Sequence, residues 1–88
     1  MKARSGFILR NLAGEYVLAP TGDEIKKFNG VAVMNELAAF VWEHLLKDAS
    51  REELLSAIVN EYDIDEGTAS GDLDALLKDM RDMGVIGD

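Results

Sequence analysis

The stretch VAVMNELAAFVWEHLL, residues 31–46, constrains the fold more than any other part of the chain. Its first four residues are apolar and half of them β-branched, which is typical of a short strand. From Asn35 onward the apolar positions recur every three or four residues, as on one buried face of a helix. The sequence therefore predicts a strand that passes directly into a helix, with Asn35 as N-cap and Trp42 in the core.

Two β-prone segments precede this junction. They cover residues 7–12 and 15–20, and the Ala13-Gly14 pair between them fits a two-residue hairpin turn. Pro20 lacks a backbone donor, so it indicates a strand end or an edge position. Residues 25–30 are expected to form a further short hairpin arm that leads into the junction.

Two further helices are expected after the junction. Ser50 and Glu53 have the spacing of a capping box, and Asp65 is suited to cap the last helix, which should end at Gly84. The three predicted helices cover about residues 35–46, 51–62 and 66–83. With strands within about residues 6–34, they predict one α+β domain over residues 1–88: a winged helix-turn-helix-like fold with an N-terminal three-stranded antiparallel sheet followed by a three-helix bundle.

The last predicted helix contains Gly67 and Gly71. Each lowers helix stability by roughly 1 kcal/mol relative to alanine if it lies in the helix interior. They indicate either an irregular first turn or a surface where another backbone approaches closely.

The charge is −8 over 88 residues, and it is concentrated near the C-terminus. Residues 61–88 hold nine acids against only Lys78 and Arg81. Such a surface repels phosphate backbones and anionic lipid, attracts basic peptides, and otherwise keeps a small domain soluble. No cysteine is present, His44 is the single histidine, and no apolar run is long enough to span a bilayer. We expect a cytoplasmic protein with no metal site or cofactor and no nucleic-acid or membrane partner.

Catalysis is not expected, because no group of residues has the type and spacing that a reaction needs. The serines have no histidine partner in any motif, and neither glycine-containing segment supplies a phosphate-binding loop. The layout of strands and helices resembles a winged helix-turn-helix, so DNA binding must be considered. Four aspartates on the last helix, however, would repel the DNA backbone. The sequence therefore favours a binding module over an enzyme.

The chain resembles the pyrroloquinoline quinone synthesis protein D (PqqD) family, whose fold is shared by the recognition elements of ribosomal peptide natural product pathways. The resemblance covers about residues 6–86. It rests on the order and spacing of five segments: residues 14–20, 33–43, 50–55, 61–63 and 76–86. Met34 departs from the family pattern, where leucine is commoner, and the segment 21–30 looks longer than the corresponding loop.

The resemblance implies that a peptide binds as an extra strand along the exposed edge of the third strand, beside the last helix. The residues that map to this site on the strand are Val31, Ala32, Val33 and Met34. Those predicted to form the helical wall are Asp72, Leu76, Asp79 and Met83. The opposite helix margin, with Leu77 and Arg81, is the competing choice, and ordinary core or solvated surface is the alternative for all eight. Trp42 is expected to anchor the edge.

Three functional hypotheses follow from these observations. The leading one, implied by the resemblance, is a non-catalytic chaperone that captures the leader of a precursor peptide and presents it to a modifying enzyme, often a radical S-adenosylmethionine (SAM) protein in similar systems. The alternative is a degenerate winged-helix DNA-binding transcriptional regulator. The third is a homodimer in which the exposed strands of two copies pair.

Overall fold

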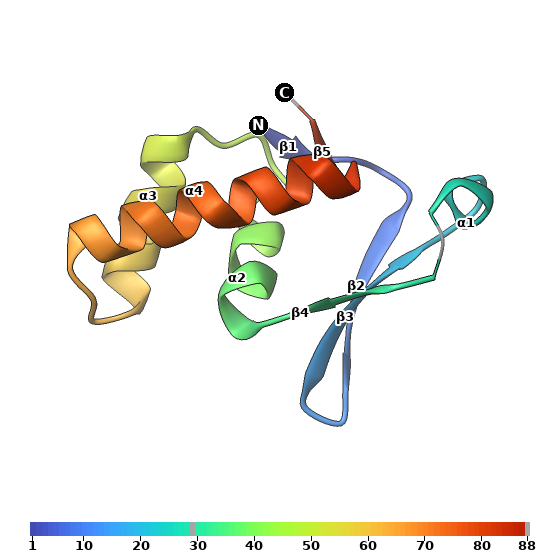
Figure 1. Ribbon diagram of the computed structural model, residues 1–88, viewed down its shortest axis with the longest axis horizontal. Coiled ribbons are helices and arrows are strands. Elements are labelled where there is room, and N and C mark those ends of the chain that lie inside the picture. Colours follow the sequence, from blue (N-terminus) through green and yellow to red (C-terminus); the bar gives the residue numbers. More distant parts are fainter. Residues whose placement is uncertain (29, 88) are drawn as a thin grey trace.

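The computed structural model describes residues 1–28 and 30–87 (Figure 1). A three-stranded sheet lies on one side of the molecule, and three helices of nine residues or more lie on the other. The strands are β1 (Lys2–Ala3), β2 (Phe7–Leu12), β3 (Glu15–Pro20), β4 (Ala32–Met34) and β5 (Ile86–Gly87). The helices are α1 (Glu24–Lys27), α2 (Glu36–His44), α3 (Arg51–Glu61) and α4 (Glu66–Met83).

The main sheet has the strand order β2-β3-β4, and both pairings are antiparallel. Ala13 and Gly14 have φ angles of 54° and 87°, which two-residue hairpin turns of type I′ require at both central positions. The turn brings Leu9 opposite Leu18, and Leu18 in turn lies opposite Ala32 of β4. The predicted three-stranded antiparallel sheet is therefore confirmed.

Between β3 and β4, the structure differs from the prediction. Residues 24–27 form a single helical turn, α1, so the expected hairpin arm was wrong. Ile25 and Phe28 are spaced as on one side of a helical turn, with an acid in the first turn and Lys26 and Lys27 in the last, and this arrangement favours helix. Asn29, part of the expected turn, lies outside the described residues.

Each of the three predicted N-caps is confirmed. The Asn35 Oδ1 accepts from the Ala38 N–H at 2.8 Å, and Ser50 forms a complete capping box with Glu53. Asp65 accepts from the N–H of Thr68 at 3.0 Å. These bonds satisfy backbone donors that the first helical turn leaves unpaired, so the predicted and observed helix starts agree within one residue.

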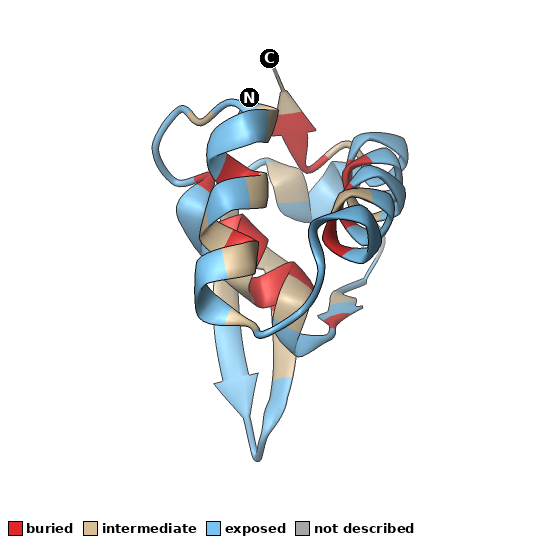
Figure 2. Cartoon of the chain, turned by 90° about the vertical axis from the view of Figure 1, so that its left-hand side faces the viewer, coloured by how far each residue is buried: buried red, intermediate tan, exposed pale blue. Residues whose placement is uncertain are grey.

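One hydrophobic core joins the inner face of the sheet to α2, α3 and α4 (Figure 2). Leu18 from the sheet and Val41, Ile58 and Leu73 from the three helices are fully buried. In Figure 2 the buried residues lie where the elements face one another, whereas the tip of the β2–β3 hairpin is exposed. The hairpin therefore projects from the core.

Trp42 is buried, as predicted, but it contacts a different edge from the one expected. Its ring packs edge-on against Phe7 of β2, with ring centroids 6.3 Å apart, and Phe7 packs in turn against Phe28. Because β2 and β4 are the two opposite edges of the sheet, Trp42 anchors the β2 edge. The β4 edge is fixed by the buried Met34 and by the cap at Asn35.

The two ends of the described chain are joined by a small second pairing. β1 pairs with β5 in antiparallel register, so that Ala3 lies opposite Ile86. Val85 and Ile86, which follow α4, are both buried and belong to the core. No helix in the described part of the chain has the length and apolar character that crossing a membrane would require.

Candidate functional site

Strand β4 has one hydrogen-bonded neighbour, β3, and its other edge is open. Along β4 the side chains alternate between the core and solvent, as in any strand. Met34 is 5% exposed, whereas Val33 is 70% exposed and the preceding Val31 is 57% exposed. Of the predicted edge segment, Val31 and Val33 are therefore accessible, whereas Met34 belongs to the core.

The hairpin geometry determines which backbone groups of β4 face the open edge. In a two-residue hairpin the flanking residues, here Leu12 and Glu15, form a hydrogen-bonded pair, and such pairs then alternate along the strands. The bond from the Thr21 N–H to the Gly6 carbonyl, 2.7 Å long, continues this alternation. Odd-numbered residues of β3 therefore bond to β2, and even-numbered residues bond to β4.

The same alternation carries over to β4. Val33 lies opposite Val17, an odd-numbered residue whose backbone groups face β2. The Val33 N–H and C=O therefore point away from β3, into the open edge. A strand added at this edge would bond to Val33, and its addition would leave the pairing of β3 with β4 intact.

A cavity of about 330 Å³ lies beside the end of β4, between the start of α2 and α4. We call it the edge groove, and its lining residues are Asn35, Leu37, Asp72, Ala75, Leu76 and Asp79. Of the predicted helical wall, Asp72, Leu76 and Asp79 lie in this groove. Met83, at the last turn of α4, is exposed but does not line it.

A second depression adjoins the edge groove on the side of the hairpin. We call it the hairpin depression, and its lining residues are Asn11, Gly14, Glu15, Tyr16, Val33, Met34, Asn35 and Glu36. Asn35 lines both hollows, so they meet at the end of β4. The predicted strand residues Val33 and Met34 thus lie in one hollow and the predicted helix residues in the other. Val31 and Ala32 line neither.

The acids of α4 differ in their surroundings. Asp74 accepts from the Arg51 Nε–H at 2.7 Å, which lowers the pKa of its carboxyl, and Asp82 accepts from Lys78 at 2.7 Å. Asp72 and Asp79, in contrast, belong to no ion pair among the residues that the structure describes. The edge groove therefore has a wall with two accessible carboxylates on either side of Leu76.

The opposite margin of α4 contains one core residue and one exposed residue. Leu77 is 3% exposed and belongs to the core, and the Arg81 Nη2 contacts the sulfur of Met1 at 3.0 Å. Of the two margins, only the predicted wall contributes to the lining of the edge groove, through Asp72, Leu76 and Asp79.

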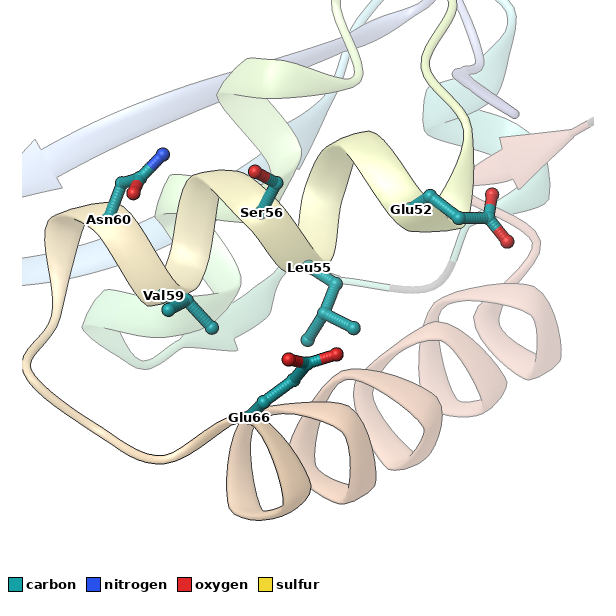
Figure 3. Close-up of a pocket in the computed structure, with 6 residues that line it drawn as sticks. All are labelled: Glu52, Leu55, Ser56, Val59, Asn60 and Glu66. Atoms are coloured by element: carbon teal, nitrogen blue, oxygen red, sulfur yellow. The ribbon is translucent and has the colours of Figure 1, made fainter.

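Another hollow, of about 270 Å³, lies between α3 and α4 (Figure 3). Leu55 and Val59 point from α3 toward Glu66 of α4 in this view, and Glu52, Ser56 and Asn60 complete the lining. No strand contributes to it, so it offers a bound peptide no backbone partner.

Comparison with known proteins identifies the family of the chain and supports its fold. The family model described as coenzyme PQQ synthesis protein D (PqqD) matches residues 6–86. The chain belongs to the PqqD family. Two solved structures share the fold: TbiB1 in complex with the TbiA(beta) leader peptide, and lasso peptide synthetase B1 complexed with the leader peptide. No curated protein matches the chain significantly.

The fold of this PqqD-family chain is similar to both structures over nearly its whole length. TbiB1 has a TM-score of 0.77 at 21% identity, and all of each chain is covered. Lasso peptide synthetase B1 has a TM-score of 0.73 at 20% identity, with 96% of this chain and 93% of that chain covered. Both similarities establish the α+β architecture, which they share with the sheet and helices described above.

Three groove residues were missed from the sequence. Asn35 is predicted only as a cap, and Leu37 is not among the predicted site residues. In the structure Asn35 is exposed, and the half-buried Leu37 packs against the core while it also lines the groove. Ala75 lies one turn from both Asp72 and Asp79, and helical periodicity alone could have placed it beside them. Periodicity does not show that α2 and α4 leave a hollow between them, which is why Leu37 was not predicted to line it.

Proposed function

We propose that this protein captures the leader segment of a ribosomally made precursor peptide as an additional strand on β4. The observation that carries the proposal is the outward N–H and C=O of Val33 at an open edge, next to the edge groove. Membership of the PqqD family and the leader peptides in the two similar structures support it.

In strand addition, backbone hydrogen bonds and side-chain contacts have different roles in recognition. Main-chain bonds to Val33 would supply affinity for many sequences, each net bond contributing about 0.5–1.5 kcal/mol. Alternate side chains of the bound strand would face the side on which α4 lies, where Leu76 offers an apolar contact. The edge groove would therefore select among leaders.

In this proposal the protein is not a catalyst. It presents the precursor to a modifying enzyme, for example a radical SAM protein. The one histidine is engaged within α2, where the His44 Nδ1 lies 2.9 Å from the Phe40 carbonyl oxygen and the two rings are in contact. Nothing in the geometry favours the DNA-binding alternative, because Asp72 and Asp79 occupy the accessible side of α4.

The proposal is tested by calorimetric titration with leader peptides encoded beside this gene, using wild type and Val33→Pro. Proline removes an N–H that the folded protein does not use internally, so the variant is expected to fold and to bind about tenfold more weakly. Val33→Thr keeps the N–H and is the matched control, with binding near that of wild type.

Two results would overturn the proposal. One is a folded Val33→Pro protein that binds leader with unchanged affinity, and the other is a folded wild type that binds none of the peptides. Leaders N-methylated at alternate residues provide a second test in which the protein is unaltered. One of the two alternation patterns should abolish binding and the other should preserve it, because only half of the peptide N–H groups face β4.

A further inference from the structure

The two hollows beside β4 have charged residues of one sign only. The edge groove contains Asp72 and Asp79, and the hairpin depression contains Glu15 and Glu36. No lysine or arginine lines either hollow. A peptide added at the open edge of β4, beside α4, would pass the two carboxylates of the edge groove and no cation in its lining, so cationic side chains would be attracted and anionic ones repelled.

The relative orientation of β4 and α4 indicates where along a bound peptide the cationic residues would lie. In Figure 1 the axes of β4 and α4 lie side by side and nearly parallel, although the chain runs along them in opposite directions. A strand paired with β4 would thus run along α4 as well. Its groove-facing side chains would pass the α4 wall one after another.

The spacing of the wall fits alternate residues of a strand. Asp72 and Asp79 are seven positions apart, or about 10.5 Å along the helix axis at about 1.5 Å per residue. Leu76 lies between them, and Ala75 leaves room beside it. Groove-facing residues of a strand recur about every 6.7 Å, so residues i and i+4 are about 13 Å apart. Long, flexible lysine and arginine side chains can cover the remaining difference.

We propose that the edge groove selects leader segments with the pattern cation-x-apolar-x-cation, in which the cations meet Asp72 and Asp79 and the apolar residue meets Leu76. The pattern reads the same in both directions, so it holds for parallel and antiparallel addition. This inference rests on the proposed function, since it assumes that the leader pairs with β4.

The test uses a displayed library of random 12-residue peptides, selected on wild type and on Val33→Pro at low ionic strength. We expect binders that depend on Val33 and carry lysine or arginine at positions i and i+4 with an apolar residue at i+2. Binders that depend on Val33 but lack this pattern would overturn the inference and leave strand addition intact. An absence of Val33-dependent binders would count against the proposed function itself.

The enriched peptides are then measured against Asp72→Asn/Asp79→Asn and against a control variant that neutralises one acid outside the edge groove. The double variant is expected to bind about three- to tenfold more weakly at low salt, as two partly exposed ion pairs would give, and the difference should shrink as salt is added. The control, Glu66→Gln, neutralises an acid of the same helix that lines the hollow facing α3 (Figure 3). An equal loss per charge removed in the control would show only a general effect of net charge, and the inference would fail.

Discussion

At the scale of single residues, the presence of glycine within α4 and at its C-cap has two different physical explanations. Helix α4 is continuous from Glu66, and a Cβ added to Gly71 would meet no atom within 4 Å. Neither an irregular turn nor a close backbone approach explains Gly71. Gly84, in contrast, has a φ of 76° at the helix end, a conformation that costs other residues energy.

These two glycines should therefore respond in opposite ways to alanine. We expect Gly71→Ala to raise the free energy of unfolding by about 0.5–1 kcal/mol, because it removes backbone freedom from the unfolded chain without a clash. Gly84→Ala should lower it by about 1–2 kcal/mol. Urea unfolding measures both. A destabilised Gly71→Ala protein would mean that the position has a contact which the structure does not show.

Single residues also show what a sequence can predict about a site. Asn35 and Ser50 were assigned correctly as caps, because a cap depends on residues three positions away along the chain. Leu37 was not predicted to line the groove, because helical periodicity gives the side of a helix but not the neighbour beside it. The groove exists only once α2 and α4 are placed beside each other, and no local pattern contains that information.

At the scale of elements, the long helices and the three strands of the main sheet were predicted, whereas α1, β1 and β5 were not. Residues 66–83 have apolar residues that repeat with the helical period over several turns, so one irregular position does not obscure the pattern. α1 has four residues, and β1 and β5 have two each. These elements are too short for a helical or strand periodicity to be recognised in the sequence. β1 and β5 also pair across almost the whole chain, so their partners cannot be inferred from neighbouring residues.

The start of α4 depends on a carboxylate, and this makes the element sensitive to acid. The Asp65 Oδ1 accepts from the N–H of Thr68, and its Oδ2 accepts from the Thr68 hydroxyl. These bonds favour the charged form, so the pKa of Asp65 is lowered from its ordinary value of 3.8. The stabilisation is thus present above that value and is lost as the pH falls through the lower, folded-state pKa.

Asp65→Asn separates this cap from the other carboxylates. Asparagine caps helices about as well as aspartate but does not titrate, so the melting temperature at pH 7 should change little. Between pH 7 and pH 3 the variant should lose less thermal stability than wild type, as followed by circular dichroism. Glu53 and Asp74, whose pKa values are also lowered, titrate in both proteins and cancel in the comparison. Equal losses in the two proteins would contradict the assignment.

At the scale of the whole molecule, the open β4 edge and the net charge act against each other. An unpaired edge with exposed Val31 and Val33 is a template for strands of any origin, including a second copy of this chain. The charge of −8 opposes the approach of another copy and does not oppose a cationic peptide. The same charge distribution therefore limits self-pairing and favours the proposed occupant.

The edge-paired homodimer can be tested on this basis. We expect light scattering to show monomers at low ionic strength, and a dimer fraction that grows with protein concentration once salt screens the charges. Val33→Pro should prevent this dimer, because pairing through β4 uses the outward N–H of Val33, and a leader peptide should dissociate it by taking the same edge. Monomers under all salt conditions would rule out self-pairing. A dimer that persists in Val33→Pro and in the presence of bound leader would place the contact elsewhere and leave the β4 edge available to the peptide.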